Sequence, residues 1–326
     1  MPVLEIPDYT RPKLLFNRHF ETIIPGLFRK VSELHYTRER INTPDGDFLD
    51  LDWHQNGQKR LVVVSHGLEG DSNRPYVQGM VRAFGQNEWD VLAWNYRGCS
   101  GEMNRLPVFY HSGATHDLET VINHVIHKNE YQQIVLIGFS LGGNLTLKYL
   151  GESKTEKFKE IKGAVVFSVP LDLAGCSMQI DKPYNFLYSR RFLSSLKKKV
   201  RVKSQWSSWT LNTDNLDMIN SIYQFDDQVT APLHGFDNAD HYYDNCSSRK
   251  FLNGIQVNTL VVNALNDPFL SSSCLDQSLF TKLNNVFFET PKQGGHCGFA
   301  RYNGDSYYWS ELRALKFIET HINLTN

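Results

Sequence analysis

The sequence has few cysteines, and their arrangement excludes two kinds of cross-link. Five cysteines are scattered over 326 residues, their number is odd, and no two of them are spaced as C-x-x-C. A disulfide framework or a structural zinc site would need regularly spaced sets of cysteine or histidine. Sparse, unpaired cysteines are typical of a reducing compartment. We therefore expect a cytoplasmic protein that holds no metal.

An excess of charge of one sign and long hydrophobic runs are also missing. The formal net charge is -1 and no long basic run occurs, so the sequence predicts no nucleic-acid partner. No stretch of 18 apolar residues is present, and the N-terminus lacks the basic-then-apolar pattern of a signal peptide. We expect no transmembrane segment and at most peripheral contact with a membrane. The composition predicts no particular oligomeric state.

Short apolar runs recur along the chain, and each is followed by turn residues and then by a helical pattern. Such runs, without alternating polar residues, are typical of strands buried on both faces of a parallel sheet. Together with an N-terminal hairpin around a Pro-Asp-Gly-Asp turn, they predict an α/β fold with a mostly parallel eight-stranded sheet and helices on both faces. The predicted strands cover residues 35–41, 48–53, 61–64, 91–94, 134–137, 164–167, 259–262 and 286–288, and the predicted helices cover 76–86, 116–127, 141–150, 270–283 and 309–321.

Between about residues 171 and 250 this alternation stops. The stretch is rich in Tyr, Ser, Lys and Asn, has no buried-strand run and contains at most three helical patterns. Because it lies between two predicted core strands, we expect a helical lid inserted into the sheet domain. We expect residues 1–30 to be an N-terminal extension that packs on the same domain, so that residues 1–326 form a single domain.

A candidate nucleophile lies where a predicted strand meets a predicted helix. Residues 138–143 read G-F-S-L-G-G, and this G-x-S-x-G pattern follows the strand at 134–137 and precedes the helix at 141–150. The nucleophile of such a motif sits on a strained turn, where only glycine avoids collisions on either side. The helix N-terminus also directs free N–H groups at a developing oxyanion. We expect Ser140 to be a catalytic nucleophile.

A serine hydroxyl needs a base to remove its proton, and the base needs an acid to orient it. His296 lies among glycines after the last predicted strand, which allows its imidazole to reach Ser140. Asp267 follows the strand at 259–262 and is the predicted acid. Asp172, after the preceding strand, is the alternative acid.

The loop after the strand at 61–64 predicts the second half of an oxyanion hole. It reads S-H-G-L-E-G, and by position we assign the backbone N–H of Leu68, with that of Leu141 as its partner. His66 and Asp71 also form an H-x4-D pattern, which is associated with acyl transfer to alcohols. A structural role for His66 is the favoured interpretation.

Aromatic residues of the expected lid predict an apolar substrate pocket. Trp206, Trp209 and Tyr242 are the residues expected to bind substrate, and an aromatic roof favours short to medium acyl chains. Further members of the expected roof are Phe186, Leu187, Tyr188 and Tyr243.

Other polar residues are given structural roles. Arg97 follows the strand at 91–94, where it is expected to tie loops together, and His111 is a second polar residue outside the triad. Asp226 and Asp227 have no histidine at a usable spacing, so no metal site is predicted.

Further motifs, spread over nearly the whole chain, carry a family resemblance. They occupy residues 17–25, 45–53, 66–70, 95–101, 110–113, 225–232 and 239–243. With these motifs and the order Ser, Asp, His, the chain resembles the YheT-like α/β hydrolases, a group that includes membrane-tethered eukaryotic lipases and ethanol acyltransferase/esterases. The resemblance implies an α/β-hydrolase fold and a triad of Ser140, Asp267 and His296. The eukaryotic relatives carry an N-terminal membrane helix that is not found here, so we expect bilayer lipids to be poor substrates.

The predicted function is hydrolysis of small carboxylic esters through an acyl-enzyme on Ser140, without a cofactor. An acyltransferase would use the same residues and pass the acyl group to an alcohol. A non-catalytic binding protein on the same fold is the alternative of a different class, although such proteins typically lose a triad member.

Overall fold

The sheet has the predicted eight strands. The computed structural model describes residues 4, 9–31, 34–128, 130–152, 159–206, 208–301 and 307–322. The strand order is β1-β2-β4-β3-β5-β6-β7-β8, with β2 antiparallel to both β1 and β4 and all other pairs parallel. The predicted mostly parallel α/β sheet is therefore confirmed. The strands are β1 (Thr37–Asn42), β2 (Phe48–His54), β3 (Arg60–Ser65), β4 (Asp90–Asn95), β5 (Gln133–Phe139), β6 (Ile161–Phe167), β7 (Asn258–Val262) and β8 (Val286–Glu289).

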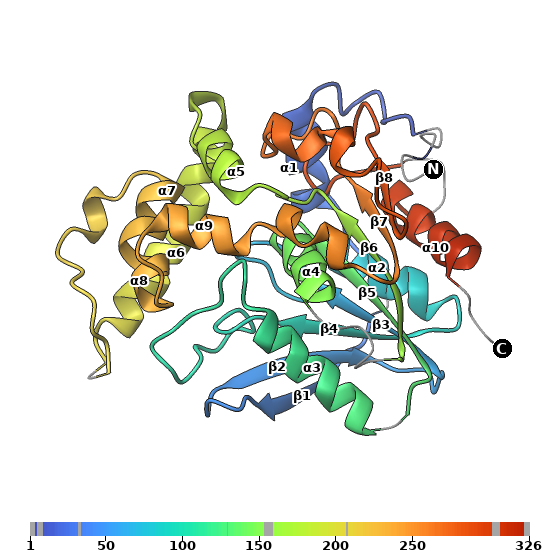
Figure 1. The fold of residues 1–326 in the computed structure, drawn as a ribbon, viewed down its shortest axis with the longest axis horizontal. Helices are drawn as coiled ribbons and strands as arrows, with labels where there is room; N and C mark the ends of the chain where they lie inside the picture. Colours follow the sequence, from blue (N-terminus) through green and yellow to red (C-terminus); the bar gives the residue numbers. More distant parts are fainter. Residues whose placement is uncertain are drawn as a thin grey trace.

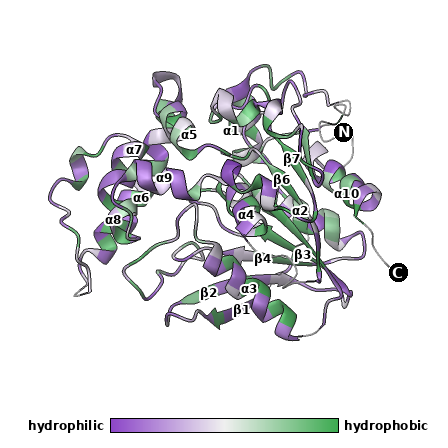
Figure 2. Ribbon diagram, viewed as in Figure 1, coloured by the Kyte–Doolittle hydropathy of each residue, from purple (hydrophilic) through white to green (hydrophobic). Residues whose placement is uncertain are grey.

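Helices cover both faces of the sheet. α2 (Pro75–Gly85) and α10 (Trp309–His321) pack on one face, while α3 (Thr115–Lys128) and α4 (Leu141–Glu152) pack on the other (Figure 1). Alternate residues of the central strands enter two separate cores, as in β3, where Val63 joins the α3/α4 core and Val62 the α2/α10 core. Burial on both faces explains why these strands are apolar throughout, and Figure 2 shows them in the hydrophobic colour.

One predicted helix is wrong. Residues 270–283 contain only two short 3-10 turns, η7 (Ser272–Leu275) and η8 (Gln277–Leu279). Asp276 between them has an extended backbone, and its side chain accepts a hydrogen bond from the N–H of Ser278 at 2.9 Å. Polar side chains that bond nearby backbone or one another compete with helix formation, and the run of three serines before Cys274 adds to this effect.

The segment between β6 and β7 is helical. Its longer helices are α5 (Leu173–Ile180), α6 (Phe186–Lys203) and α9 (Ala239–Cys246), which agrees with three helical patterns. The sequence did not predict the short elements between them, which are α7 (Ile222–Phe225), the π-helical turn η4 (Asp226–Thr230) and α8 (Ala231–Leu233). In Figure 1, α6 to α9 lie together beyond one end of the sheet.

The N-terminal segment forms one helix, α1 (Arg18–Phe28), which contacts α6 through His19 and Tyr188. Asn17 caps this helix by accepting hydrogen bonds from the N–H groups of His19 and Phe20. The side chain of Glu21 is buried, whereas Leu27 and Phe28 are exposed. Pro25 is also buried and Ile24 packs against a small core cluster, so the helix contacts the domain through both polar and apolar side chains. Residues 1–3 and 5–8 of the expected extension lie outside the described residues.

Candidate active site

Ser140 occupies a tight turn between β5 and α4. Its φ is +53°, a left-handed conformation that is rare for residues other than glycine and stores backbone strain. A Cβ atom at Gly138 would collide with the backbone of Gly142, and one at Gly142 would collide with the carbonyl of Ser65. The two flanking glycines are therefore required because the helix approaches the strand so closely.

The structure brings the three predicted catalytic residues into one hydrogen-bonded line. His296 Nε2 lies 2.9 Å from Ser140 Oγ, and His296 Nδ1 lies 2.9 and 3.0 Å from the two carboxylate oxygens of Asp267. The Asp267 carboxylate is buried and also accepts a hydrogen bond from the N–H of Phe269 at 2.9 Å. The Phe269 ring packs on the imidazole, with ring centroids 4.3 Å apart. These contacts fix the carboxylate and the imidazole plane.

Charge around His296 favours its protonated form. Burial opposes a charge on the imidazole, but the Asp267 carboxylate, followed by the neighbouring Cys297, outweighs burial and raises the pKa of His296 to about 10. An imidazole paired with a carboxylate can hold the proton that it takes from a serine hydroxyl. Because the raised pKa keeps the imidazole protonated at lower pH, the neutral form of His296 that can act as a base increases as the pH rises.

α1 supports the loops that carry both His296 and Asp267. The Glu21 carboxylate accepts hydrogen bonds from the N–H of Gly294 at 2.6 Å and from Asn266 Nδ2 at 2.9 Å. Thr22 Oγ1 accepts a hydrogen bond from the N–H of His296 at 2.9 Å. The sequence pattern did not predict this supporting role of Glu21, although the residue lies in the 17–25 motif.

Hydrogen bonds orient the peptide that carries the N–H of Leu68. The preceding carbonyl, of Gly67, accepts hydrogen bonds from His66 Nδ1 at 2.8 Å and from the N–H of Gly70 at 3.0 Å. The N–H of a trans peptide points away from its carbonyl, so these bonds also set the direction of the Leu68 N–H. His66 Nε2 accepts a hydrogen bond from the N–H of Tyr96, and burial lowers the pKa of His66 to about 3. The favoured structural role of His66 thus fits its surroundings, because both ring nitrogens are occupied.

Two cavities meet at Ser140. The first, cavity A, runs under the helices between β6 and β7 and is lined mainly by apolar side chains such as Phe109, Leu173 and Val229. The second, cavity B, lies between α1 and α6 and includes His296 in its wall. Ser140, Leu68 and Glu69 line both.

Of the three aromatic residues predicted to bind substrate, only Tyr242 lines one of these two cavities. Tyr242 lines cavity A, as does Tyr243, and Tyr188 lines cavity B. Trp206 and Trp209 line neither cavity. They follow the C-terminus of α6, where Trp209 donates a hydrogen bond to the carbonyl of Leu211 and Trp206 lies beside the Lys203 ammonium group. Phe186 and Leu187 are exposed.

Asp172, the alternative acid, has other partners. Its side chain caps α5 at the N–H of Gly175 and pairs with Arg249 at 3.2 Å. Ser273 also donates a hydrogen bond to it at 2.6 Å. No contact joins Asp172 to His296 within the described residues.

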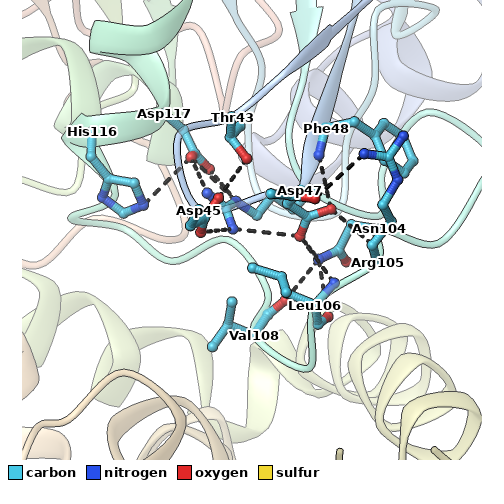
Figure 3. Close-up of polar contacts among 12 residues, drawn as sticks. Thr43, Asp45, Asp47, Phe48, Asn104, Arg105, Leu106, Val108, His116 and Asp117 are labelled. Atoms are coloured by element: carbon cyan, nitrogen blue, oxygen red, sulfur yellow. Dashed lines mark hydrogen bonds and ion pairs between the residues drawn. The ribbon is translucent and has the colours of Figure 1, made fainter.

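Arg97 is part of a buried polar network outside the two cavities. Its guanidinium group pairs with Asp117 at 2.7 Å and with Asp45 at 2.7 Å. Asp47 accepts hydrogen bonds from Asn104 and from the backbone of Arg105, which closes the network (Figure 3). Arg97 therefore ties separate segments together, as expected, and it does so through carboxylates.

The remaining acidic candidates also have structural partners. Asp226 accepts hydrogen bonds from Thr230 and Tyr243, and burial raises its pKa to about 6. Asp227 accepts one from the N–H of Ala239. Among the described residues, no three His, Cys, Asp or Glu side chains are arranged to hold a metal ion, and no helix is both long and apolar enough to cross a bilayer.

A doubly wound sheet with a serine on a strained strand-to-helix turn defines the α/β-hydrolase class. A family model of the alpha/beta hydrolase fold matches residues 60–300. The YheT protein of Escherichia coli (strain K12) is 35% identical over 291 residues, covering 87% of this chain and 84% of the relative. The chain therefore belongs to the α/β-hydrolase family, as one of its YheT-like members.

More distant relatives and solved structures agree with this assignment. Phospholipase ABHD3 of Bos taurus is 29% identical over 289 residues, covering 86% of this chain and 70% of its own. Monoacylglycerol lipase of Saccharomyces cerevisiae is 28% identical over 294 residues, covering 86% of this chain and 64% of the lipase. The structure of the esterase Pf2001 from Pyrococcus furiosus superposes with a TM-score of 0.61 at 16% identity, covering 90% of this chain and 97% of the esterase. This likeness shows the fold alone.

Proposed function

We propose that the protein is a serine hydrolase that cleaves carboxylic esters through an acyl-enzyme on Ser140. The observation that carries the proposal is the hydrogen-bonded line from Ser140 through His296 to Asp267, placed where two cavities meet. The names of its relatives support ester cleavage in general, since they include a phospholipase and a monoacylglycerol lipase.

In the proposed first step, Ser140 Oγ attacks the ester carbonyl and His296 Nε2 takes its proton. The N–H groups of Leu68 and Leu141 bind the oxyanion that forms. The proton then passes from His296 to the leaving alkoxide, and the alcohol departs. Water, activated by the same imidazole, attacks the acyl-enzyme and releases the acid. These steps need no cofactor.

In this proposal each cavity holds one half of the ester. His296 must reach the leaving-group oxygen, and it lies in the wall of cavity B. The alcohol therefore occupies cavity B, and the acyl group extends into the more apolar cavity A beneath the proposed lid. Each buried methylene of the acyl chain contributes roughly 0.8 kcal/mol, or about fourfold in kcat/KM if fully used. Short to medium chains should gain with length until cavity A is filled.

A fluorophosphonate probe and a series of p-nitrophenyl esters test the proposal. The probe should label one site in the wild type and none in Ser140→Ala, and ester hydrolysis should be lost with it. Excess glycerol or ethanol distinguishes the acyltransferase alternative, because a transferase would form the new ester faster than the free acid. Labelling or hydrolysis that survives in Ser140→Ala would contradict the assignment.

A further inference from the structure

Cavity A is lined mainly by apolar side chains but also has two histidines in its wall. His111 and His234 both line this cavity, and their ring centroids are 4.3 Å apart. His111 precedes α3, whereas His234 follows α8, so the pair joins the sheet domain to the proposed lid. An apolar acyl chain alone would give these two imidazoles no hydrogen-bond partner.

The hydrogen bonds of His111 define its tautomer. Its Nδ1 accepts a hydrogen bond from the N–H of Gly113 at 3.2 Å, so the proton of the neutral ring is on Nε2. Cys246 packs behind this loop so closely that a Cβ atom at Gly113 would collide with its sulfur. In the described part of the chain no protein acceptor receives the Nε2–H of His111, and the atom is not sealed from the cavity.

The imidazole of His234, like that of His111, can form a hydrogen bond with a ligand in cavity A. Its ring nitrogens make no hydrogen bond to protein among the described residues, although each neutral imidazole has one N–H donor and one acceptor. Burial lowers the pKa of His234 to about 4 and also holds the pKa of His111 well below its ordinary value. Both rings are therefore neutral near pH 7 and suit a neutral polar group.

The loop of His111 is held by a residue of α4 one turn beyond the reaction centre. Asn144 is one helical turn after Ser140, about 6 Å along the helix axis. Its side-chain amide donates hydrogen bonds to the carbonyls of Ser112 and Cys246, which hold the loop of His111 in place. On the far side of the wall, the π-helical turn η4 brings Asp226 and Thr230 into the same cavity. Such turns occur frequently at functional sites.

We infer that cavity A takes an acyl group with a neutral hydrogen-bond acceptor, such as a ketone or hydroxyl oxygen, several carbons beyond the ester carbonyl. His111 Nε2–H and the N–H of His234 donate to that oxygen. The inference rests on the proposed function and specifies its substrate class. A site with buried donors discriminates against a ligand that leaves them unpaired.

Matched pairs of p-nitrophenyl esters test this inference. Acyl chains with a ketone at the fifth, sixth or seventh carbon are each compared with the methyl-branched chain of the same shape. At the best position, kcat/KM for the ketone should exceed that for its branched partner by about tenfold. His111→Phe and His234→Phe should bring this ratio close to one, and His111→Gln, which keeps a donor, should retain part of it. His116→Phe is the matched control, because His116 is exposed and lies next to His111 outside the cavity wall, and it should keep the full ratio.

The outcomes separate the inference from the proposed function. A ratio near one at every position in the wild type, with plain esters hydrolysed and Ser140 labelled, would overturn the inference and leave the hydrolase assignment standing. A full ratio that persists in both Phe variants would also overturn it. If no ester is hydrolysed and Ser140 is not labelled, the result contradicts both the inference and the proposed function. Fluorophosphonate labelling of the Phe variants shows whether their sites remain folded, and if they do not, the wild-type ratios and His111→Gln decide.

Discussion

At the scale of single residues, the contacts of Asp267 distinguish it from Asp172. Asp267 bonds His296 and the N–H of Phe269, whereas Asp172 is occupied by a helix cap and an ion pair. Both aspartates follow strands of the same sheet, so their positions in the sequence alone left two acids open. The packing of the His296 loop against α1 determines which carboxylate the imidazole meets.

Asp267→Asn should lower kcat by roughly 10³–10⁴-fold, because the imidazole loses the carboxylate that fixes its tautomer and stabilises its charge. Asp172→Asn should change kcat by no more than a few-fold. Steady-state kinetics on one p-nitrophenyl ester measures both. The reverse order of effects would contradict the assignment of Asp267 as the acid.

The raised pKa of His296 predicts an alkaline activity profile. The imidazole must be neutral to accept the Ser140 proton, and its pKa of about 10 means that the neutral form increases as the pH rises towards that value. We expect kcat/KM to increase with pH between about 7 and 10. In Asp267→Asn the carboxylate that raises the pKa is gone, so the residual activity should reach its plateau at a lower pH. A wild-type plateau already at pH 6 would contradict this expectation.

At the scale of secondary-structure elements, two lysines, Lys199 and Lys203, join α6 to the sheet domain. Lys199 Nζ donates to Glu69 Oε1 at 2.7 Å, and Ser195, one turn earlier, donates to the same carboxylate. Tyr110 donates to it at 2.8 Å and accepts from the N–H of Glu69. Glu69 has a left-handed φ of +52° and directly follows Leu68, the predicted oxyanion donor. Helix α6 therefore holds the loop that sets the Leu68 N–H.

Lys199→Met should lower kcat by about tenfold, because the Glu69 carboxylate loses its cation and the neighbouring Leu68 N–H loses its fixed direction. Combining it with Glu69→Gln should cost less than the sum of the two single changes, as expected for coupled groups. Lys198→Met, an exposed lysine on the same helix, is the control. Additive effects in the double variant would argue against the coupling.

Lys203 anchors the end of the same helix. Its ammonium group is fully buried and donates hydrogen bonds to Asn104 Oδ1 at 2.6 Å and to the carbonyls of Leu106 and Val108 at 2.6 and 2.8 Å. Lys203→Met should reduce the free energy of unfolding by roughly 1–3 kcal/mol, since Asn104 Oδ1 loses its donor and the carbonyls of Leu106 and Val108 keep only their hydrogen bonds from Asn104 Nδ2. Urea denaturation followed by circular dichroism measures this loss, with Lys198→Met as the control. A loss below about 1 kcal/mol would mean that water replaces the ammonium group.

At the scale of the whole molecule, residues far apart in the sequence complete one site. α1 near the N-terminus bonds the loops of Asp267 and His296, while the turn that carries Ser140 lies in the middle of the chain. Glu21 is 1% exposed and connects α1 with Gly294 and Asn266, and Arg11 pairs with it at 2.9 Å. The N-terminal segment is thus part of the support of the candidate active site.

Glu21→Gln should lower kcat by roughly 10–100-fold with a smaller change in KM, because the amide can accept from only one of Gly294 N–H and Asn266 Nδ2 and sets its own NH2 group against the other donor. The fluorophosphonate probe separates positioning from unfolding. A positioning role predicts slower labelling that still reaches the full amount of protein, whereas unfolding predicts a reduced final amount. Glu319→Gln, an exposed carboxylate on α10, is the control. Wild-type labelling rates in Glu21→Gln would contradict the role.

The sequence alone determined the elements whose residues are constrained locally. Strands buried on both faces must be apolar along their length, and the turn at Ser140 needs a glycine on either side. Each of these requirements leaves a pattern in the sequence. The helix predicted at 270–283 failed because Ser and Asp side chains form local hydrogen bonds that an apolar spacing does not reveal.

Only the tertiary structure decided which distant side chains meet. Glu21, Glu69 and Lys203 are charged residues, and each is buried or nearly buried only because a partner from another element satisfies it. The aromatics of the proposed lid show the same limit, since Trp206 and Trp209 follow the end of α6 and line neither cavity, while Tyr242 lines cavity A. Composition predicts that such side chains will be buried, but the packing of α6 and α9 against the sheet domain determines which of them line the cavity.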